Sequence, residues 1–201
     1  MSRPLPLDGA RHAQHQRIID LDAAEAAAAA FVAALGISTE DESTRNTPRR
    51  MARAYVDFFT PRPFELTTFP NDAGYDELIL AKAIPFRSIC EHHLLPFLGV
   101  AHVGYLPGDR ILGLSKLARV VEHFACRPQV QERFTKQIAD WLNENLSPRG
   151  VGVVIEAEHS CMTLRGAQAV GSSTVTSTLV GVLREDHRTR EEFLGLSRRR
   201  D

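Results

Sequence analysis

The chain has 201 residues, of which 43% are hydrophobic, and this is enough to bury one core. Its 24 basic and 25 acidic residues give a net charge of −1, so no overall field attracts nucleic acid or an anionic membrane surface. Three unevenly spaced cysteines do not form a disulfide framework, which predicts a reducing, cytoplasmic setting. We therefore expect one main domain, with neither nucleic acid nor membrane as a partner.

The N-terminal part of the chain is predicted to be an arm followed by a helix. Residues 1–20 contain prolines and lack apolar periodicity, which predicts a mobile arm. Asp22 can cap a helix over residues 23–35, and Gly36 can close it. Because the Ala-rich segment of this helix is too short to cross a bilayer, we expect it to be a helix in water.

A second helix is predicted before the main domain. Thr47 can cap it, with Pro48 at its first position, and Pro61 stops it. The chain is thus expected to consist of the arm, an N-terminal helical region at residues 21–62 and a main domain at residues 63–201.

The main domain is predicted to begin with strands. Residues 77–89 are strand-like, with an interruption at Pro85. Residues 99–105 and 110–113 flank the turn sequence Leu106-Pro107-Gly108-Asp109, which predicts a hairpin.

Two amphipathic helices are predicted next, and Ser115 is the expected N-cap of the first. Apolar residues recur at helical spacing in both segments. They are Leu117, Val120, Val121 and Phe124 in the first helix, and Val130, Phe134, Ile138, Trp141 and Leu142 in the second.

Two further strands and a short helix complete the chain. Alternating apolar residues at 151–155 lead toward His159, and residues 173–183 are rich in Thr and Val. Thr189 and Glu192 have the spacing of a capping box for the last helix. This order of elements predicts an α+β fold with an antiparallel sheet.

Two short segments place sulfur beside imidazole. Cys90 and His93 stand at i and i+3, and His159 and Cys161 alternate along a strand, so each pair can point at one ion. A single Cys or His is most often structural, but two such pairs favour a zinc site. Two cysteines and one histidine leave the fourth tetrahedral position open, as in catalytic zinc. Cys126 has no adjacent His and is expected to be a free thiol.

Five segments carry a pattern that is more specific than any single zinc motif. They are Cys90-Glu91-His92-His93, Gly113-Leu114-Ser115-Lys116-Leu117-Ala118-Arg119, Arg127-Pro128-Gln129-Val130-Gln131-Glu132-Arg133, His159-Ser160-Cys161 and Arg165-Gly166. Taken together and in this order, they resemble the zinc-dependent GTP cyclohydrolase I family, and the resemblance runs from about Thr47 to Leu194. It implies a tunnelling fold, with helices on one side of an antiparallel sheet and an N-terminal helical extension, assembled into a toroidal homodecamer.

The resemblance also implies a reaction. GTP and water give formate and 7,8-dihydroneopterin triphosphate, the first step of tetrahydrofolate and pterin biosynthesis. Opening the purine imidazole ring requires hydroxide at C8, and zinc can lower the pKa of bound water from 15.7 to about 7. Cys90, His93 and Cys161 are the expected zinc ligands. His92 and His159 are expected to carry protons; their alternative role is to support the ligands.

Further residues match substrate contacts of the family. Glu132 is expected to accept hydrogen bonds from guanine N1–H and its amino group, with Gln131 beside it. A surface charge is the alternative reading of Glu132, and a salt bridge or solvated charge is the alternative for each cation. The triphosphate is expected to meet Ser115, Lys116, Arg119, Arg165 and Arg50.

Two other functions fit part of the pattern. A non-catalytic, zinc-stabilised binding module would need a closed metal site, with His92 or Cys126 as fourth ligand. Another tunnelling-fold enzyme could use a cysteine as nucleophile on a purine-like substrate. The predicted triphosphate cations disfavour the first, and the pairing of both cysteines with histidines disfavours the second.

Overall fold

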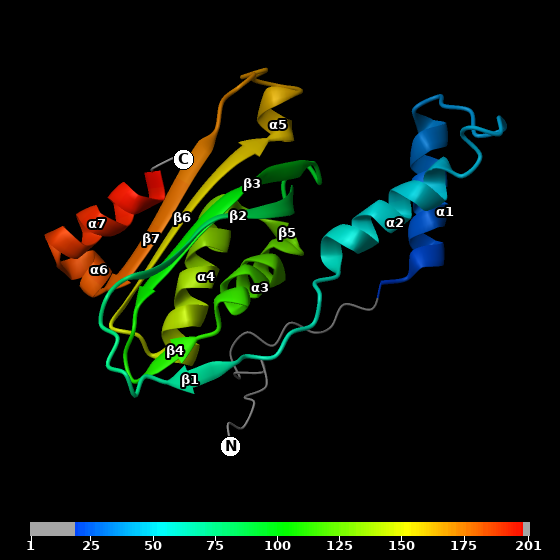
Figure 1. Cartoon of the computed structure of the whole chain (residues 1–201). Helices are drawn as coiled ribbons and strands as arrows, with labels where there is room; N and C mark the ends of the chain where they lie inside the picture. The colour runs from blue at the N-terminus through cyan, green and yellow to red at the C-terminus, as the bar shows by residue number, and fades with distance from the viewer. Residues whose placement is uncertain (1–18, 199–201) are drawn as a thin grey trace. The chain divides into compact units, whose positions relative to one another are not determined.

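The computed structural model describes residues 19–198, which form two compact units, residues 19–61 and 62–198. Figure 1 shows the elements of both units. The predicted N-terminal arm lies almost wholly outside the described residues. No helix in the described part of the chain has the length and apolar character needed to cross a bilayer.

The first unit begins with α1 (Leu21–Ala34). Its N-cap is Asp20, whose carboxylate accepts a hydrogen bond from the Ala23 N–H at 2.9 Å. The prediction of Asp22 as the cap was wrong by two residues, because the helix starts earlier than its alanine run. Gly36 follows the helix with a φ of 74°, the left-handed conformation that ends helices and favours glycine.

The second helix of this unit, α2 (Thr47–Phe59), packs against α1. Asn46 is its N-cap, so the prediction of Thr47 as the cap was wrong; Thr47 is already helical. An ion pair between Arg49 and Glu25, at 2.9 Å, also joins the two helices.

The second unit is built on a five-stranded sheet with the order β5-β2-β3-β6-β7. β5 runs parallel to β2, and every other pairing is antiparallel, so the sheet is mixed. The strands are β2 (Ile79–Cys90), β3 (Pro96–Leu106), β5 (Pro128–Gln129), β6 (Gly150–His159) and β7 (Thr174–Gly181).

The irregularity in β2 lies a few residues before the predicted position. The register with β3 shifts between Ala81 and Ile84, and Ala83 has a φ of 51°. Pro85 continues the strand opposite Val100. Proline is tolerated there because β5 pairs only with Ile89 and Cys90, the last two residues of β2. At Pro85 the edge of β2 that faces away from β3 therefore has no partner strand and needs no N–H donor.

The predicted hairpin is wrong. β4 (Arg110–Leu112) pairs with β1 (Thr68–Pro70) in a separate two-stranded sheet. It has no free edge of β3 to join, because β2 and β6 occupy both sides of that strand. The Asn71 side chain holds the turn instead, donating a hydrogen bond to the Gly108 carbonyl at 2.9 Å.

Two long helices cover one face of the sheet, α3 (Leu114–Ala125) and α4 (Gln131–Leu146). The apolar positions predicted for them are buried and form the main core with the sheet, except Val130, which is half-buried at the N-cap of α4. The N-cap of α3 is Gly113, so Ser115 lies in the first turn rather than at the cap.

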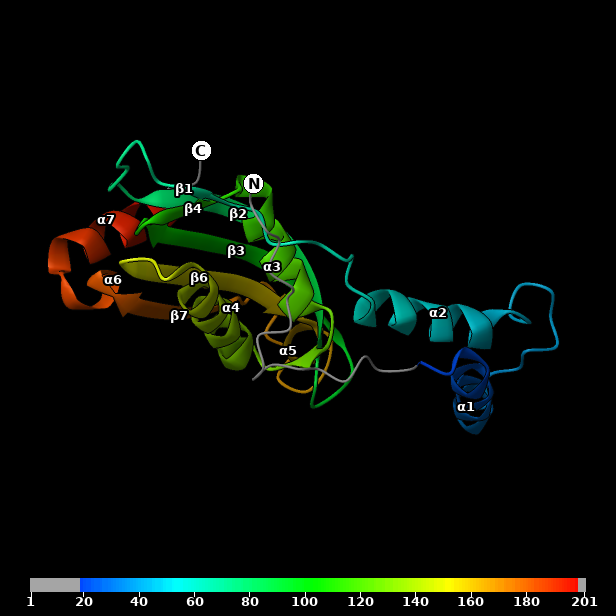
Figure 2. The ribbon, with the colours of Figure 1, turned by 90° about the horizontal axis from the view of Figure 1, so that it is seen from below.

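Helices also cover part of the opposite face, which the prediction of helices on one side missed. α6 (Val182–Glu185) and α7 (His187–Arg198) lie across the strands from α4 (Figures 1 and 2). Phe193 of α7 is fully buried, and a Cβ at Gly152 would lie 2.8 Å from its ring. The lack of a side chain at Gly152 therefore makes room for the Phe193 ring, which forms a second, smaller core with Leu106 and Leu183.

The end of the chain differs from its prediction in two details. β7 ends at Gly181, whose φ is 60°, so the following residues form α6 rather than more strand. Asp186 caps α7 by accepting hydrogen bonds from the Thr189 N–H and hydroxyl, in place of the predicted capping box with Glu192.

Candidate metal and substrate site

The two predicted ligand segments meet at one end of the sheet, which we call the ligand end. β2 finishes at Cys90 and β6 finishes at His159, and the short helix α5 (Ser160–Thr163) carries Cys161. The antiparallel register brings them together, since β3 begins beside both: Pro96 pairs with Ile89, and Phe97 pairs with His159.

Side chains at the ligand end form a metal-binding arrangement. In the described part of the chain, one group of three His, Cys, Asp or Glu side chains has ligand atoms within 4.8 Å of one another, and it consists of Cys90, His159 and Cys161. His93 Nδ1 lies 3.7 Å from the Cys90 sulfur, and His92 Nδ1 lies 4.0 Å from it. Thiolate and imidazole are donors that zinc prefers.

The two thiols lie close enough to affect each other. Burial raises the pKa of the Cys161 thiol, and contact with Cys90 raises it further, whereas Arg165 acts in the opposite direction. A cation bound between the two sulfurs would offset this cost, because metal ligation requires the deprotonated thiols. Arg165 follows α5 by two residues and therefore lies near the ligand end, and its role as a substrate contact stays a prediction.

A tight turn presents the two histidines that follow Cys90. The Leu94 N–H donates to the Cys90 carbonyl and the Cys90 N–H to the Leu95 carbonyl, both at 2.8 Å. Leu94 has a φ of 52°. Because these hydrogen bonds close the turn, the imidazoles of His92 and His93 are held near the sulfur of Cys90.

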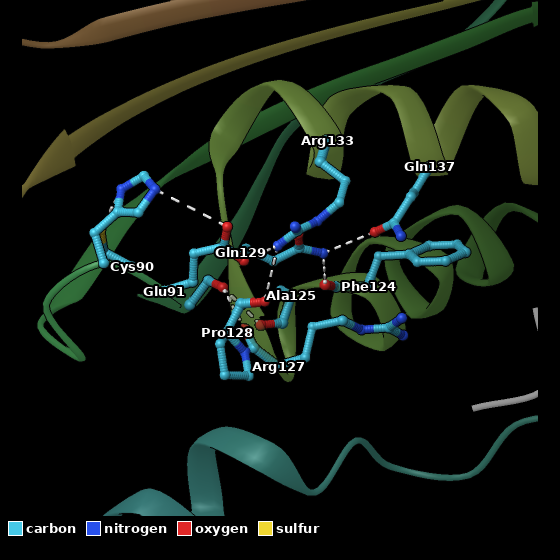
Figure 3. A network of polar contacts seen from close by, with 11 residues as sticks. Cys90, Glu91, Phe124, Ala125, Arg127, Pro128, Gln129, Arg133 and Gln137 are labelled. Carbon is cyan, nitrogen blue, oxygen red and sulfur yellow. Dashed lines mark hydrogen bonds and ion pairs between the residues drawn. The ribbon is translucent and has the colours of Figure 1, made fainter. Parts of the chain in front are cut away.

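Glu91, within this turn, is tied to α4. Its carboxylate pairs with Arg133, which lowers the pKa of Glu91, and its other oxygen lies 4.0 Å from His92 Nε2. Arg133 also donates to the Gln129 side-chain oxygen at 3.0 Å. Figure 3 shows Arg133 reaching from α4 to Glu91 and Gln129.

Gln129 anchors this network in the core. It is fully buried, and its amide donates to the Phe124 carbonyl and the Gln137 side chain, both at 2.8 Å (Figure 3). Arg133 and Gln129 stand in one of the segments that carry the resemblance, but their sequence positions gave them no role. Glu91 lies 42 residues from Arg133, so no local spacing indicates this contact.

His159 is held by contacts on two sides. Its ring stacks on Phe97, with a centroid distance of 4.4 Å and an interplanar angle of 4°. Its Nε2 lies 2.8 Å from Gln131 Oε1. Burial lowers the pKa of His159, and Glu132 acts to raise it, so both predicted guanine contacts lie beside this imidazole.

The other predicted phosphate contacts are not gathered at the ligand end of the same chain. The first turns of α3 follow β4, at the far end of β3, where the Leu112 N–H donates to the Tyr105 hydroxyl. From Pro96 to Tyr105 the strand covers about 30 Å. Figure 1 shows β4 and α5 at opposite ends of the sheet. The residues in these first turns are Ser115, Lys116 and Arg119.

Arg119 has an acidic partner on its own helix. It pairs with Glu122 at 3.2 Å, and Glu122 also accepts two-pronged hydrogen bonds from Arg62 at 2.7 Å. Spacing of i and i+3 could have indicated the first pair, but not the second, which spans 60 residues. Arg50 belongs to α2 in the first unit.

Comparisons with known proteins cover nearly the whole described chain. A sequence model of the family described as GTP cyclohydrolase I matches residues 24–198. The GTP cyclohydrolase 1 of Aquifex aeolicus (strain VF5) is 50% identical over 178 residues, which are 89% of this chain and 97% of the relative. The GTP cyclohydrolase 1 of Homo sapiens is 51% identical over 178 residues, 86% of this chain and 71% of the relative. This chain belongs to the GTP cyclohydrolase I family.

Proposed function

We propose that this enzyme of the GTP cyclohydrolase I type opens the imidazole ring of GTP at a zinc site, giving formate and 7,8-dihydroneopterin triphosphate for pterin and folate synthesis. The observation that carries the proposal is the clustering of Cys90, His159 and Cys161 in a chain about 50% identical to enzymes named GTP cyclohydrolase 1. The proposal includes a cytoplasmic setting, since thiol ligands must stay reduced.

The donor set fits zinc. Cys90, His93 and Cys161 would hold the ion with two thiolates and one imidazole and leave a fourth position open. Zinc, when bound, would polarise the water that attacks C8. His159 lies within the same cluster, but its ring is already held by Gln131 and Phe97, which suits a fixed proton carrier.

The remaining residues of the ligand end would bind guanine and move protons. His92 and His159 would exchange protons with the purine ring during opening and formate release. Glu132 would accept hydrogen bonds from N1–H and the amino group of guanine. The side-chain amide of Gln131 is engaged within the protein, so its backbone N–H, in the first turn of α4, would contact the substrate.

Replacement of Glu132 by glutamine is expected to weaken GTP use. An amide presents one acceptor to two donors, and losing a charged hydrogen-bond partner costs about 1.5–3 kcal/mol, or roughly 10–150-fold in kcat/KM. Steady-state kinetics with GTP measures this. Lys136→Gln is a matched control on the same helix, because Lys136 pairs with Asp140. Equal kcat/KM for Glu132→Gln and the wild type would make Glu132 a solvent-exposed charge.

The triphosphate is proposed to be bound by cations from more than one chain. Arg165 lies at the ligand end, whereas Lys116 and Arg119 lie toward the far end of their own sheet, so they would serve a neighbouring subunit. Arg50, from the helical region at residues 21–62, would add another contact. This arrangement fits a toroidal homodecamer in which residues 63–201 form a tunnelling-fold catalytic domain.

Mixing two inactive variants tests the shared site. Cys90→Ala and Lys116→Ala are each expected to be poorly active. A restored site needs an intact Cys90 from one chain and an intact Lys116 from the adjoining chain. In a random equal mixture each condition is met half of the time, so about a quarter of the sites should be restored. The two proteins are unfolded together, refolded and assayed, with light scattering to confirm a closed oligomer. Activity no higher than that of the separate variants would place both residues in one chain's site.

The reaction itself is tested by its products. Purified protein incubated with GTP is expected to release formate and a pterin that becomes fluorescent on oxidation. GTP that stays intact, or loses phosphate without formate release, would contradict the proposed function.

A further inference from the structure

Gln131 is a buried polar residue, and its side chain takes no part in the proposed contact with guanine, which is made by its backbone N–H. It is 2% exposed and lies at the first position of α4. Its amide nitrogen lies 3.1 Å from the Ile155 carbonyl oxygen and 2.9 Å from that of Thr174. Its amide oxygen lies 2.8 Å from His159 Nε2. The side chain thus links α4, β6 and β7 to the imidazole.

These three contacts fix the orientation of the amide. Main-chain carbonyl oxygens only accept hydrogen bonds, so both N–H groups of the Gln131 amide are consumed by Ile155 and Thr174. Exchanging the amide oxygen and nitrogen would set an oxygen against two carbonyl oxygens, which is unfavourable. Oxygen therefore faces His159, and because an amide oxygen cannot donate, Nε2 of His159 carries the hydrogen.

The same contact selects one of two ring orientations. A half-turn of the His159 ring would leave the stacking on Phe97 unchanged, since both rings stay parallel. It would, however, replace Nε2 by a carbon opposite the Gln131 oxygen and break that hydrogen bond. Phe97 thus holds the plane of the ring, and Gln131 decides which edge faces the metal-binding cluster.

We propose that Gln131 is a positioning residue that holds the His159 ring in one orientation, with Nε2–H donating to the Gln131 side-chain oxygen and the ring plane set by Phe97. The inference rests on the proposed function for the proton-carrying role of His159.

Gln131→Met tests this role, because methionine has a similar length and cannot accept from Nε2. We expect kcat to fall about 10–100-fold, the usual effect of removing a hydrogen bond that orients a functional histidine, with KM for GTP and metal content retained. Thr135→Val is the matched control. Thr135 is 1% exposed and its hydroxyl donates to the Gln131 carbonyl at 2.7 Å, so loss of the hydroxyl loosens the same turn without touching His159.

Nitrogen NMR of protein labelled in its eight histidines tests the proton position directly. The His159 signals are identified by their absence in His159→Gln. We expect a proton on Nε2 in the wild type. A hydrogen on Nδ1 with a bare Nε2 would overturn the proposal, as would equal kcat losses in Gln131→Met and Thr135→Val. Wild-type protein that fails to convert GTP would instead overturn the proposed function, and the NMR result would still decide the proton position.

Discussion

Replacing Cys90 or Cys161 by alanine is expected to abolish metal binding and GTP turnover together. Each change removes one of two thiolates, and a site with three protein ligands cannot hold zinc tightly with two. Cys90 ends β2 and Cys161 lies in α5, so neither thiolate can replace the other. Metal analysis of the purified variants, alongside formate release from GTP, measures both effects.

Cys126→Ala is the matched control for these variants. Cys126 follows α3, away from the cluster, and burial raises the pKa of its thiol, which disfavours the thiolate form that binds metal. We expect this variant to keep its metal and its activity. Loss of metal from Cys126→Ala, with retention in Cys161→Ala, would show that the assigned ligand set is wrong.

His92→Ala and His159→Ala are expected to keep zinc while kcat falls about 10²–10⁴-fold, the usual contribution of a positioned proton carrier. Their separate positions support this expectation. His92 lies on the turn after β2, next to Glu91, whereas His159 ends β6 against Phe97. Steady-state kinetics and metal analysis on the same samples separate proton transfer from ligation.

His187→Ala provides the comparison, because His187 is exposed at the start of α7. It should match the wild type in both measurements. A His92 variant without zinc would make His92 a ligand in place of His93. Wild-type turnover by both His92→Ala and His159→Ala would remove them from the mechanism.

Local patterns predicted the elements of the fold better than their ends or partners. The buried positions of α3 and α4 were correct because helical periodicity depends on residues three or four apart. Helix caps were displaced by one to three residues, since residues such as Asp20 and Asp186 compete with nearby residues that can also cap a helix. The hairpin failed because the turn sequence before Arg110 does not reveal that both edges of β3 are taken.

In the candidate site, too, residues with a local sequence pattern were predicted, whereas contacts between distant residues were not. Spacing alone pointed to Cys90 and Cys161, and the antiparallel register brought them together. The supporting contacts join residues far apart in sequence: Glu91 with Arg133, and Gln131 with His159 across 28 residues. Such pairs carry no local signal, so they became visible only in three dimensions.

Adding zinc back to metal-free protein tests most directly whether the Cys90 and Cys161 cluster carries out the reaction. The protein is stripped with a chelator and titrated with zinc while formate release from GTP is followed. We expect no turnover without metal and a linear rise that saturates at about one zinc per chain. Full turnover by metal-free protein, or saturation unaffected by Cys161→Ala, would contradict a zinc-dependent GTP cyclohydrolase built on these residues.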